Sequence, residues 1–195
     1  MLQRTNWRLT VSDTSFPSDL PVPQDDGACS HLTGFKIPSV SLPSTSGEKV
    51  NVSKLSGLAI IFCYPRTGAP GEQIPDEWNI IPGARGCTPQ ACSFRDEMDE
   101  LRKLGVNTIF GVSTQDTPYQ QEVKSRVHLP YELLSDADLE FTKALKLPTF
   151  DWQGNKLIKR LALAVEDSQI TKVWYPVFPP DANAKEVVAW LAERN

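Results

Sequence analysis

Two cysteines five residues apart, Cys87 and Cys92, are the side chains in this sequence whose type and spacing could do chemistry. They lie in the stretch GARGCTPQACSFRD, residues 83–96, which has the pattern of a helix that begins near Cys87. Five steps along an α-helix advance about 7.5 Å and turn about 500°, which puts the two Cα atoms roughly 8 to 9 Å apart. A disulfide needs Cα atoms closer than about 7 Å. We therefore expect free thiols in the intact helix and a disulfide only after local unwinding.

Cys87 has the sequence surroundings of a nucleophilic thiol. The thiolate is the reactive form of cysteine, and a helix N-terminus or a nearby cation favours it. Cys87 follows Gly86 at the expected start of the helix, where unpaired N–H groups and the helix dipole attract an anion. Arg85 precedes it, and Arg95 lies further along next to Asp96. Two interpretations stay open: an activated thiol, or an ordinary residue at a helix start followed by an exposed Arg95–Asp96 pair.

The presence of Cys92 favours the first interpretation, an activated thiol with a redox role. Oxidation of a thiolate gives a sulfenic acid, which a second thiol can capture as a disulfide before it oxidises further. Because Cys92 cannot reach Cys87 along an intact helix, the reduced protein keeps Cys87 free to react. Oxidation would then drive the unwinding that brings the two sulfurs together. The spacing is unsuited to a permanent disulfide. It suits a disulfide that forms on oxidation and is broken again on reduction.

The other two cysteines have different surroundings. Cys63 lies in the apolar run LAIIFCY, residues 58–64, which predicts a strand buried on both faces, so we expect a thiol of the core. Cys29 lies in the irregular stretch DDGACSHL; an exposed free thiol is the simpler expectation, and a distant resolving thiol is the alternative. Four unevenly spaced cysteines do not indicate a secreted disulfide framework. One close pair plus the distant Cys29 and His31 is a poor match to structural zinc.

Composition restricts the classes of protein to consider. The 195 residues suit one domain with a sizeable core. The charge is mildly acidic, with 20 Lys and Arg against 24 Asp and Glu, and no block of like charge indicates a nucleic-acid-binding arm. No run approaches the roughly 18 apolar residues of a membrane span, and the N-terminus lacks the apolar middle of a secretory signal. We expect a cytoplasmic protein, with an organelle transit segment as the weaker alternative.

The chain divides into a leader and one domain. Residues 1–34 are rich in Pro, Ser and Asp and show no sustained period, which predicts an extended N-terminal leader. Residues 35–195 carry the periodic patterns of a folded domain. That domain is expected to begin with a hairpin around a Ser-Gly turn in residues 35–55, followed by the buried strand 58–64. Residues 66–86, rich in Gly and Pro, then predict a long loop.

Strands and helices alternate in the rest of the domain. Apolar residues recur at three and four positions from Thr88 to Leu104, which predicts one amphipathic helix that Gly105 ends. Further elements are expected in this order: strand 107–114, helix 117–129, strand or turn 131–136, helix 137–147, an antiparallel hairpin of strands 157–165 and 169–177, and a closing helix 183–193. This order indicates an α/β protein with a thioredoxin-like fold, in which helices cover a mixed central sheet.

Several of these motifs together resemble a known family. The segments YP, GCTPQACSFRD, GVSTQD and LPYELLSD, with a late strand that carries an Arg, are similar to peroxiredoxins of the alkyl hydroperoxide reductase and thiol-specific antioxidant superfamily. The nearest group is the Q-type, or bacterioferritin comigratory protein, group. The resemblance covers about residues 35–192. It implies that Cys87 is the peroxidatic nucleophile and that Cys92 is the resolving thiol.

The chain departs from the family pattern at one position. Peroxiredoxins carry Pro-x-x-x-Thr-x-x-Cys at the nucleophile, but here Ala84 stands three residues before Cys87. Pro65 and Thr67 follow the buried strand instead, so we interpret residues 66–86 as an insertion within the motif. The resemblance implies that Pro65 and Thr67 belong to the site if the fold returns them to the thiolate. A hydrogen bond supplied by another group is the alternative.

A late arginine completes the expected site. Arg160, in KRLALAV, matches the late-strand arginine of the family. Beside Cys87, its guanidinium would hold the thiolate and stabilise the charge that develops as a peroxide O–O bond breaks. Its neighbour Lys159 is expected on the other face of the strand, in solvent. Trp78, in the inserted loop, is expected either to cover the pocket or, more simply, to anchor the loop.

The resemblance implies a thiol peroxidase. Cys87 would reduce hydrogen peroxide or small organic hydroperoxides, Cys92 would resolve the sulfenic acid, and thioredoxin or glutaredoxin would reduce the disulfide. No metal, organic cofactor, nucleic acid or membrane is expected as a partner, and the oligomeric state stays open between monomer and homodimer. Ala84 and the insertion motivate two alternatives on the same fold: a redox sensor or binding module, or a pocket that acts on a non-peroxide metabolite.

Overall fold

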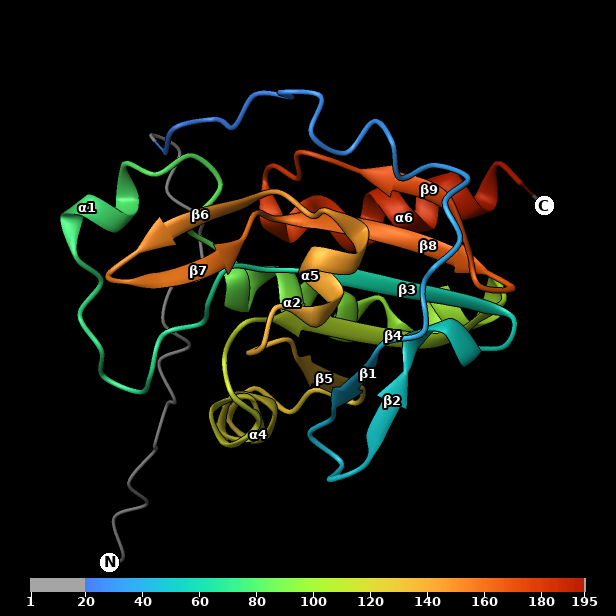
Figure 1. Cartoon of the computed structure of the whole chain (residues 1–195), viewed down its shortest axis with the longest axis horizontal. Helices are drawn as coiled ribbons and strands as arrows, with labels where there is room; N and C mark the ends of the chain where they lie inside the picture. Colours follow the sequence, from blue (N-terminus) through green and yellow to red (C-terminus); the bar gives the residue numbers. More distant parts are fainter. Residues whose placement is uncertain (1–19, 195) are drawn as a thin grey trace, which may run out of the picture.

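A five-stranded mixed sheet forms the centre of the computed structural model, which describes residues 20–194 (Figure 1). The strand order is β5-β4-β3-β8-β9. The strands are β3 Leu58–Cys63, β4 Val106–Ser113, β5 Glu132–Ser135, β8 Leu161–Glu166 and β9 Gln169–Trp174. β3, β4 and β5 are parallel, whereas β8 is antiparallel to β3 and β9 is antiparallel to β8. The mixed central sheet predicted from the sequence is confirmed.

β3 is the middle strand and is buried along its whole length. Because side chains alternate along a strand, they enter two apolar clusters, one on each face of the sheet. One cluster receives Ala59, Ile61 and Cys63, and the other receives Leu58, Ile60 and Phe62. Both faces are covered, which is why the strand is apolar at every position. Cys63 is a core thiol, as predicted.

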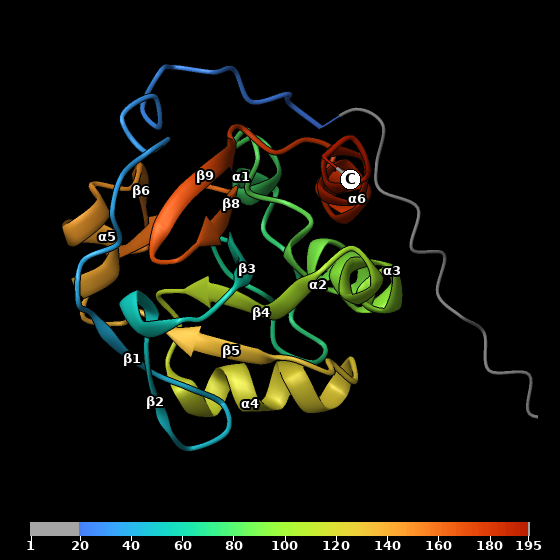
Figure 2. The same ribbon diagram turned by 90° about the vertical axis from the view of Figure 1, so that its right-hand side faces the viewer.

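Helices cover both faces of this sheet (Figure 2). In Figure 2, α2, α3 and α6 lie together on one side of the sheet, α5 lies on the other side, and α4 lies beside β5. The helices are α1 Asp76–Asn79, α2 Cys87–Asp96, α3 Met98–Lys103, α4 Thr117–Arg126, α5 Glu140–Leu145 and α6 Asn183–Ala192, with 3-10 turns η1 Val52–Lys54 and η2 Pro180–Ala182. Within residues 20–194, no helix is both long and apolar enough to span a membrane.

The single helix expected from Thr88 to Leu104 is in fact two helices. α2 ends at Asp96, and α3 begins at Met98. Between them the backbone of Glu97 leaves the helical region, with φ −92° and ψ 6°, so the helix axis is interrupted there. The predicted stop is confirmed: Gly105 has a φ of 93°, the left-handed conformation that favours glycine after a helix.

The helix expected over residues 137–147 is also shorter than predicted. Leu139 has a φ of 59°, which is incompatible with a right-handed helix, so α5 begins only at Glu140. The carboxylate of Asp136 accepts hydrogen bonds from the N–H groups of Phe141 and Thr142 at 2.9 Å and 2.8 Å. The start of α5 is therefore fixed by a side chain that lies outside the apolar pattern.

Two antiparallel hairpins flank the central sheet. β1 Ser41–Pro43 pairs with β2 Lys49–Asn51, which confirms the hairpin predicted in residues 35–55. The hairpin of β6 Thr149–Trp152 and β7 Asn155–Ile158 was not predicted. Its turn residues Gln153 and Gly154 both have positive φ, 48° and 78°, as a two-residue hairpin turn requires. The strand expected over 157–165 is consequently divided between two sheets.

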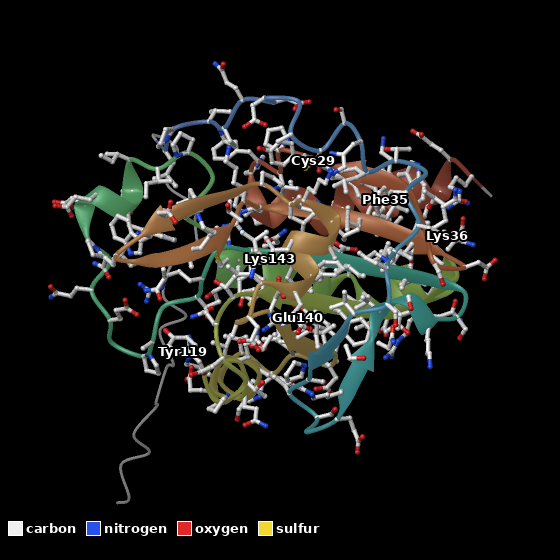
Figure 3. All side chains as sticks on the ribbon, in the orientation of Figure 1. Cys29, Phe35, Lys36, Tyr119, Glu140 and Lys143 are labelled. Atoms are coloured by element: carbon white, nitrogen blue, oxygen red, sulfur yellow. The ribbon has the colours of Figure 1, made fainter. Side chains whose placement is uncertain are left out.

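The described part of the leader packs against the domain. Leu32 and Cys29 are buried in the same apolar cluster as Cys63, and the N–H of Gly34 donates to the carbonyl of Ile170 at 2.7 Å. The expectation of an exposed Cys29 is therefore wrong: Cys29, labelled on the N-terminal segment in Figure 3, is only 5% exposed because it packs into this cluster. Residues 1–19 lie outside the described residues, and the boundary at residue 34 stays a prediction.

Candidate active site

Cys87 is the first residue of α2, as the sequence predicted. Gly86 before it has a φ of 96°, a conformation that glycine adopts without strain, and this turn directs the chain into the helix. Phe94 holds α2 on the sheet by stacking on Phe62 of β3, with ring centroids 4.6 Å apart. The Cys87 side chain consequently sits between the helix start and the sheet and is only 4% exposed.

Arg160 lies directly against this thiol. One guanidinium nitrogen, Nη2, is 3.1 Å from Sγ of Cys87, and the arginine is itself 3% exposed. The two residues are 73 positions apart in the sequence and meet because β8, which begins at Leu161, pairs with β3. A buried guanidinium at this distance stabilises negative charge on the sulfur. The structure therefore brings together the two residues that the sequence placed at the centre of the site.

The loop before Cys87 is wrapped around the same guanidinium. Nε of Arg160 donates to the carbonyl of Gly83 at 3.2 Å, and Nη2 donates to the carbonyls of Ala84 and Arg85 at 3.1 Å and 2.9 Å. The thiol of Cys87 itself donates to the carbonyl of Ala84 at 3.6 Å. Ala84, which lacks the expected hydroxyl, thus contributes its main-chain oxygen. When the thiol loses its proton this bond is lost, and the contact with Arg160 remains.

Two further buried residues belong to the site and were not singled out from the sequence. Oε1 of Gln90 accepts a hydrogen bond from Nη1 of Arg160, and Nε2 of Gln90 donates to Oδ1 of Asn183 at 2.9 Å. Gln90 stands three residues after Cys87 on α2, on the same helix face, which is a signal that the sequence does contain. Asn183 is 93 residues further on, and no spacing in the sequence connects it to Cys87.

Thr67 and Pro65 are both buried, directly after β3. The hydroxyl of Thr67 donates to Oε1 of Gln115 at 3.1 Å, and its carbonyl accepts from Nε2 of Gln115 and from the hydroxyl of Tyr119. Figure 3 labels Tyr119, which reaches this strand end from α4. Across residues 20–194 the structure has no hydrogen bond between Thr67 and Cys87, so the role of Thr67 and Pro65 at the thiolate stays a prediction.

Cys92 lies in the middle of α2, half-buried, and both it and Cys87 are free thiols. Burial raises the pKa of Cys92, although the nearby Arg95 partly opposes this. Arg95 forms the expected pair with Asp96, at 2.8 Å, and also donates to the carbonyl of Val127 at 2.7 Å. Arg85 donates to Asn79 at 3.0 Å. Both arginines are thus engaged with groups other than Sγ of Cys87.

The remaining two thiols are not activated. Burial raises the pKa of Cys63 well above its usual range. It also raises the pKa of Cys29 to about 12, with a further contribution from the negative charges of Asp26 and Asp25. A thiol that stays protonated at neutral pH is a poor nucleophile. Cys87, in contrast to these two thiols, has Nη2 of Arg160 3.1 Å from its sulfur.

Residues 66–86, interpreted from the sequence as an insertion, are anchored to the β6–β7 hairpin. Trp78 of α1 is buried and packs edge-on against Trp152 of β6, with ring centroids 5.1 Å apart. The simpler of the two expectations for Trp78 therefore fits the structure. Beside Arg160 the end of the segment borders a pocket of about 230 Å³. This pocket is lined by Pro23, Gln24, Ile81, Pro82, Gly83, Phe150, Lys159, Arg160, Tyr175, Pro176 and Val177.

The sequence and the fold are both similar to those of known proteins. The profile of the Redoxin family matches residues 32–188. The chain is 29% identical over 189 residues to peroxiredoxin Q, chloroplastic, of Oryza sativa subsp. japonica, which covers 94% of this chain and 79% of the relative. It is 35% identical over 106 residues to peroxiredoxin Bcp of Escherichia coli strain K12, which covers 54% of this chain and 58% of that relative. The solved structure of peroxidoxin BcpB from Mycobacterium tuberculosis is similar with a TM-score of 0.69 at 25% identity, covering 85% of this chain and 99% of that one.

Proposed function

Because the chain belongs to the Redoxin family, we propose that it is a thiol-dependent peroxidase in which Cys87 is the peroxidatic nucleophile. The observation that carries the assignment is the 3.1 Å contact between Nη2 of Arg160 and Sγ of Cys87 at the start of α2. A helix N-terminus and a buried guanidinium both favour the thiolate. The peroxiredoxins among its relatives agree with this reaction class.

The first step is attack of the Cys87 thiolate on the terminal oxygen of a hydroperoxide. An S–O bond forms while the O–O bond breaks, so the sulfur is oxidised to a sulfenic acid and the peroxide is reduced to water or an alcohol after the leaving oxygen takes a proton. Negative charge develops on the leaving oxygen during this step. Arg160 is held in place by the carbonyls of Gly83, Ala84 and Arg85, so it can stabilise that charge without rearrangement.

Resolution is the second step, and we assign it to Cys92. The Cys92 sulfur attacks Sγ of Cys87, an S–S bond forms, and the sulfenic oxygen leaves as water. In α2 as it stands the two cysteines are five residues apart on one helix, which is too far for a disulfide. Part of α2 must therefore unwind between oxidation and resolution.

Return to the reduced state requires an external dithiol. We propose a thioredoxin or glutaredoxin, which exchanges thiols with the Cys87–Cys92 disulfide and becomes oxidised itself. Such a cycle suits a reducing compartment, for which we propose the cytoplasm, and it works in a monomer or a homodimer because both thiols come from one chain. Hydrogen peroxide and small organic hydroperoxides are the proposed substrates.

Stopped-flow mixing of the reduced protein with substoichiometric hydrogen peroxide, followed by tryptophan fluorescence and peptide mapping, tests this assignment. Wild type is expected to oxidise rapidly and to form a Cys87–Cys92 disulfide. Cys92→Ser should oxidise at the same rate and accumulate a sulfenic acid, whereas Cys87→Ser should lose the fast reaction by at least about 1000-fold. Cys63→Ser is the matched control, because Cys63 is buried to a similar degree without a guanidinium partner.

Two outcomes contradict the proposal. If wild type reacts no faster than Cys87→Ser, Cys87 is not activated and the fold serves another substrate. If oxidation is fast but a dithiol reductant supports no sustained turnover, the protein is a redox sensor and not a peroxidase.

A further inference from the structure

A chain of three buried polar side chains connects the nucleophile to a distant helix. Arg160 contacts Cys87, Gln90 accepts from Arg160, and Asn183 accepts from Gln90. All three polar residues are at least 97% buried, and Gln90 and Asn183 are fully buried. Gln90 belongs to α2, and Asn183 is the first residue of α6. Buried hydrogen bonds of this kind act as a unit, because each fixes the orientation of the next group.

The donors of Arg160 and the acceptor of Asn183 together fix how the Gln90 amide is oriented. A glutamine side chain has an accepting oxygen at one position and donating N–H groups at the other, whereas a guanidinium can only donate. If the Gln90 amide were reversed, its NH₂ group would face the donors of Arg160 and no hydrogen bond would form. Oδ1 of Asn183 accepts from Nε2 of Gln90 at 2.9 Å, which favours the orientation with the oxygen towards Arg160.

Asn183 is well suited to this task because α6 is firmly packed. Ala184, Val187 and Leu191, on one face of α6, are buried in the same apolar cluster as Cys87 and Phe94 of α2. The position of Asn183 therefore does not depend on Gln90. The hydrogen bond between them ties α2, which must unwind during the proposed cycle, to α6, which need not move.

We propose that Asn183 is a positioning residue with opposite effects on the two chemical steps. This inference rests on the proposed function of Cys87 and Cys92. In the oxidation step, Asn183 orients Gln90, which holds Arg160 against Sγ of Cys87. In the resolution step it is an obstacle, because Gln90 lies between Cys87 and Cys92 and must leave Asn183 when that segment unwinds.

The test is Asn183→Ala in the full-length protein, with stopped-flow separation of the two phases. The oxidation rate rises with peroxide concentration, whereas the resolution rate does not. We expect oxidation at pH 7 to be about 3- to 10-fold slower, with a pH–rate profile displaced to higher pH, because the guanidinium is held less firmly. We expect resolution to be about threefold faster, because one hydrogen bond that opposes unwinding is lost.

Two variants separate this role from general loosening of α6. Val187→Ala removes buried contacts of the same helix but leaves the Asn183–Gln90 bond in place, so it should leave the pH–rate profile unchanged. Asn183→Asp keeps an accepting oxygen at the same position, next to a favourable helix N-terminus, and should restore oxidation to within about twofold of wild type. Asn183→Asp also keeps the proposal testable if the alanine variant does not fold.

A double substitution tests whether Asn183 acts through Gln90. In a Gln90→Ala background, Asn183→Ala should change neither phase further, since the group it positions is already gone. The proposal is overturned if Asn183→Ala leaves the pH–rate profile unchanged, if it slows both phases together, or if the two substitutions add independently. A wild type without fast oxidation overturns the peroxidase assignment itself, and that failure is visible before any Asn183 variant is made.

Discussion

Cys63 and Cys87 lie on opposite faces of the same sheet and are almost equally withdrawn from solvent, at 0% and 4% exposure. Cys63 lies in an apolar cluster, and burial, with a further contribution from the negative charge of Asp136, raises its pKa well above the usual range. Cys87 instead has Nη2 of Arg160 at 3.1 Å and stands at the start of a helix. Burial alone therefore does not determine whether a thiol is reactive. What differs between the two faces is the sign of the buried charge near the sulfur, which is positive at Cys87, from Arg160, and negative at Cys63, from Asp136.

The largest expected effect is a difference in alkylation rate between the thiols of the two faces. Because burial raises the pKa of Cys29 to about 12, about one molecule in 100,000 carries its thiolate at pH 7. We expect iodoacetamide to modify Cys87 at least about 1000-fold faster than Cys29 or Cys63 in the native protein. Peptide mass spectrometry over time measures the three rates. The unfolded protein is the control, because all three thiols should react at similar rates there. Equal rates of the three thiols in the native protein would contradict the contrast between the two faces.

The next effect in size concerns the guanidinium itself. Arg160→Met removes the charge and the donors that face Cys87, and we expect the rate of oxidation by hydrogen peroxide to fall about 100-fold. Lys159→Met is the matched control, because it removes a charge one position away whose partner is Asp26, and it should change the rate by less than about twofold. If both variants behave alike, the positive charge of the region, and not the contact with Sγ, activates the thiol.

A smaller effect is expected at Thr67. Thr67→Val has nearly the same shape but loses the hydroxyl that donates to Gln115. We expect the oxidation rate to fall less than about threefold and the free energy of unfolding to fall by about 1 kcal/mol, the usual value for one buried hydrogen bond. Stopped-flow oxidation and urea unfolding give the two numbers. A drop in rate as large as that of Arg160→Met would show that Thr67 reaches the thiolate during the reaction and that Cys87 has two partners.

The smallest effect is expected where the leader covers Cys29. Hydrogen bonds from Lys159 and then Tyr175 lower the pKa of Asp26 from 3.8 to about 2. Because the pKa is lower in the folded state, Asp26 contributes stability above about pH 4, and this contribution is lost as the pH falls towards 2. The stability difference between wild type and Asp26→Asn should therefore be constant near neutral pH and disappear in acid. At pH 7 the substitution should speed alkylation of Cys29 by less than about threefold, since the pair is exposed and screened by salt.

The fold could be predicted where local pattern and tertiary environment agree. The apolar run 58–64 predicted β3 because both faces of that strand are covered, and the helix start at Cys87 was indicated by the glycine before it. The β6–β7 hairpin was missed because its turn, Gln153–Gly154, lacks the Asn or Asp that usually marks such a turn. The same hairpin ends the strand expected over 157–165, so a single missed turn changed two elements.

The site could be predicted only in part. Cys87 and Cys92 were proposed from their spacing, and Arg160 from the family resemblance, since nothing local distinguishes it from an arginine at a strand entrance. Burial of Cys29 could not be anticipated, because the leader has no periodic pattern and is ordered by contacts with β9. Asn183 was equally out of reach, because its contact with Gln90 depends on how α6 packs against α2.

Cys87 precedes Arg160 by 73 residues along the chain. A ribosome therefore delivers Cys87 first, and at about 5 to 20 residues per second roughly 4 to 15 seconds pass before Arg160 is added. Throughout that interval β8 and α6 do not yet exist, and the sulfur has no guanidinium beside it. An unfinished or truncated chain thus exposes a cysteine of ordinary reactivity. Under the proposed function, Cys87 gains the guanidinium that would make it sensitive to peroxide only when β8 has joined the sheet.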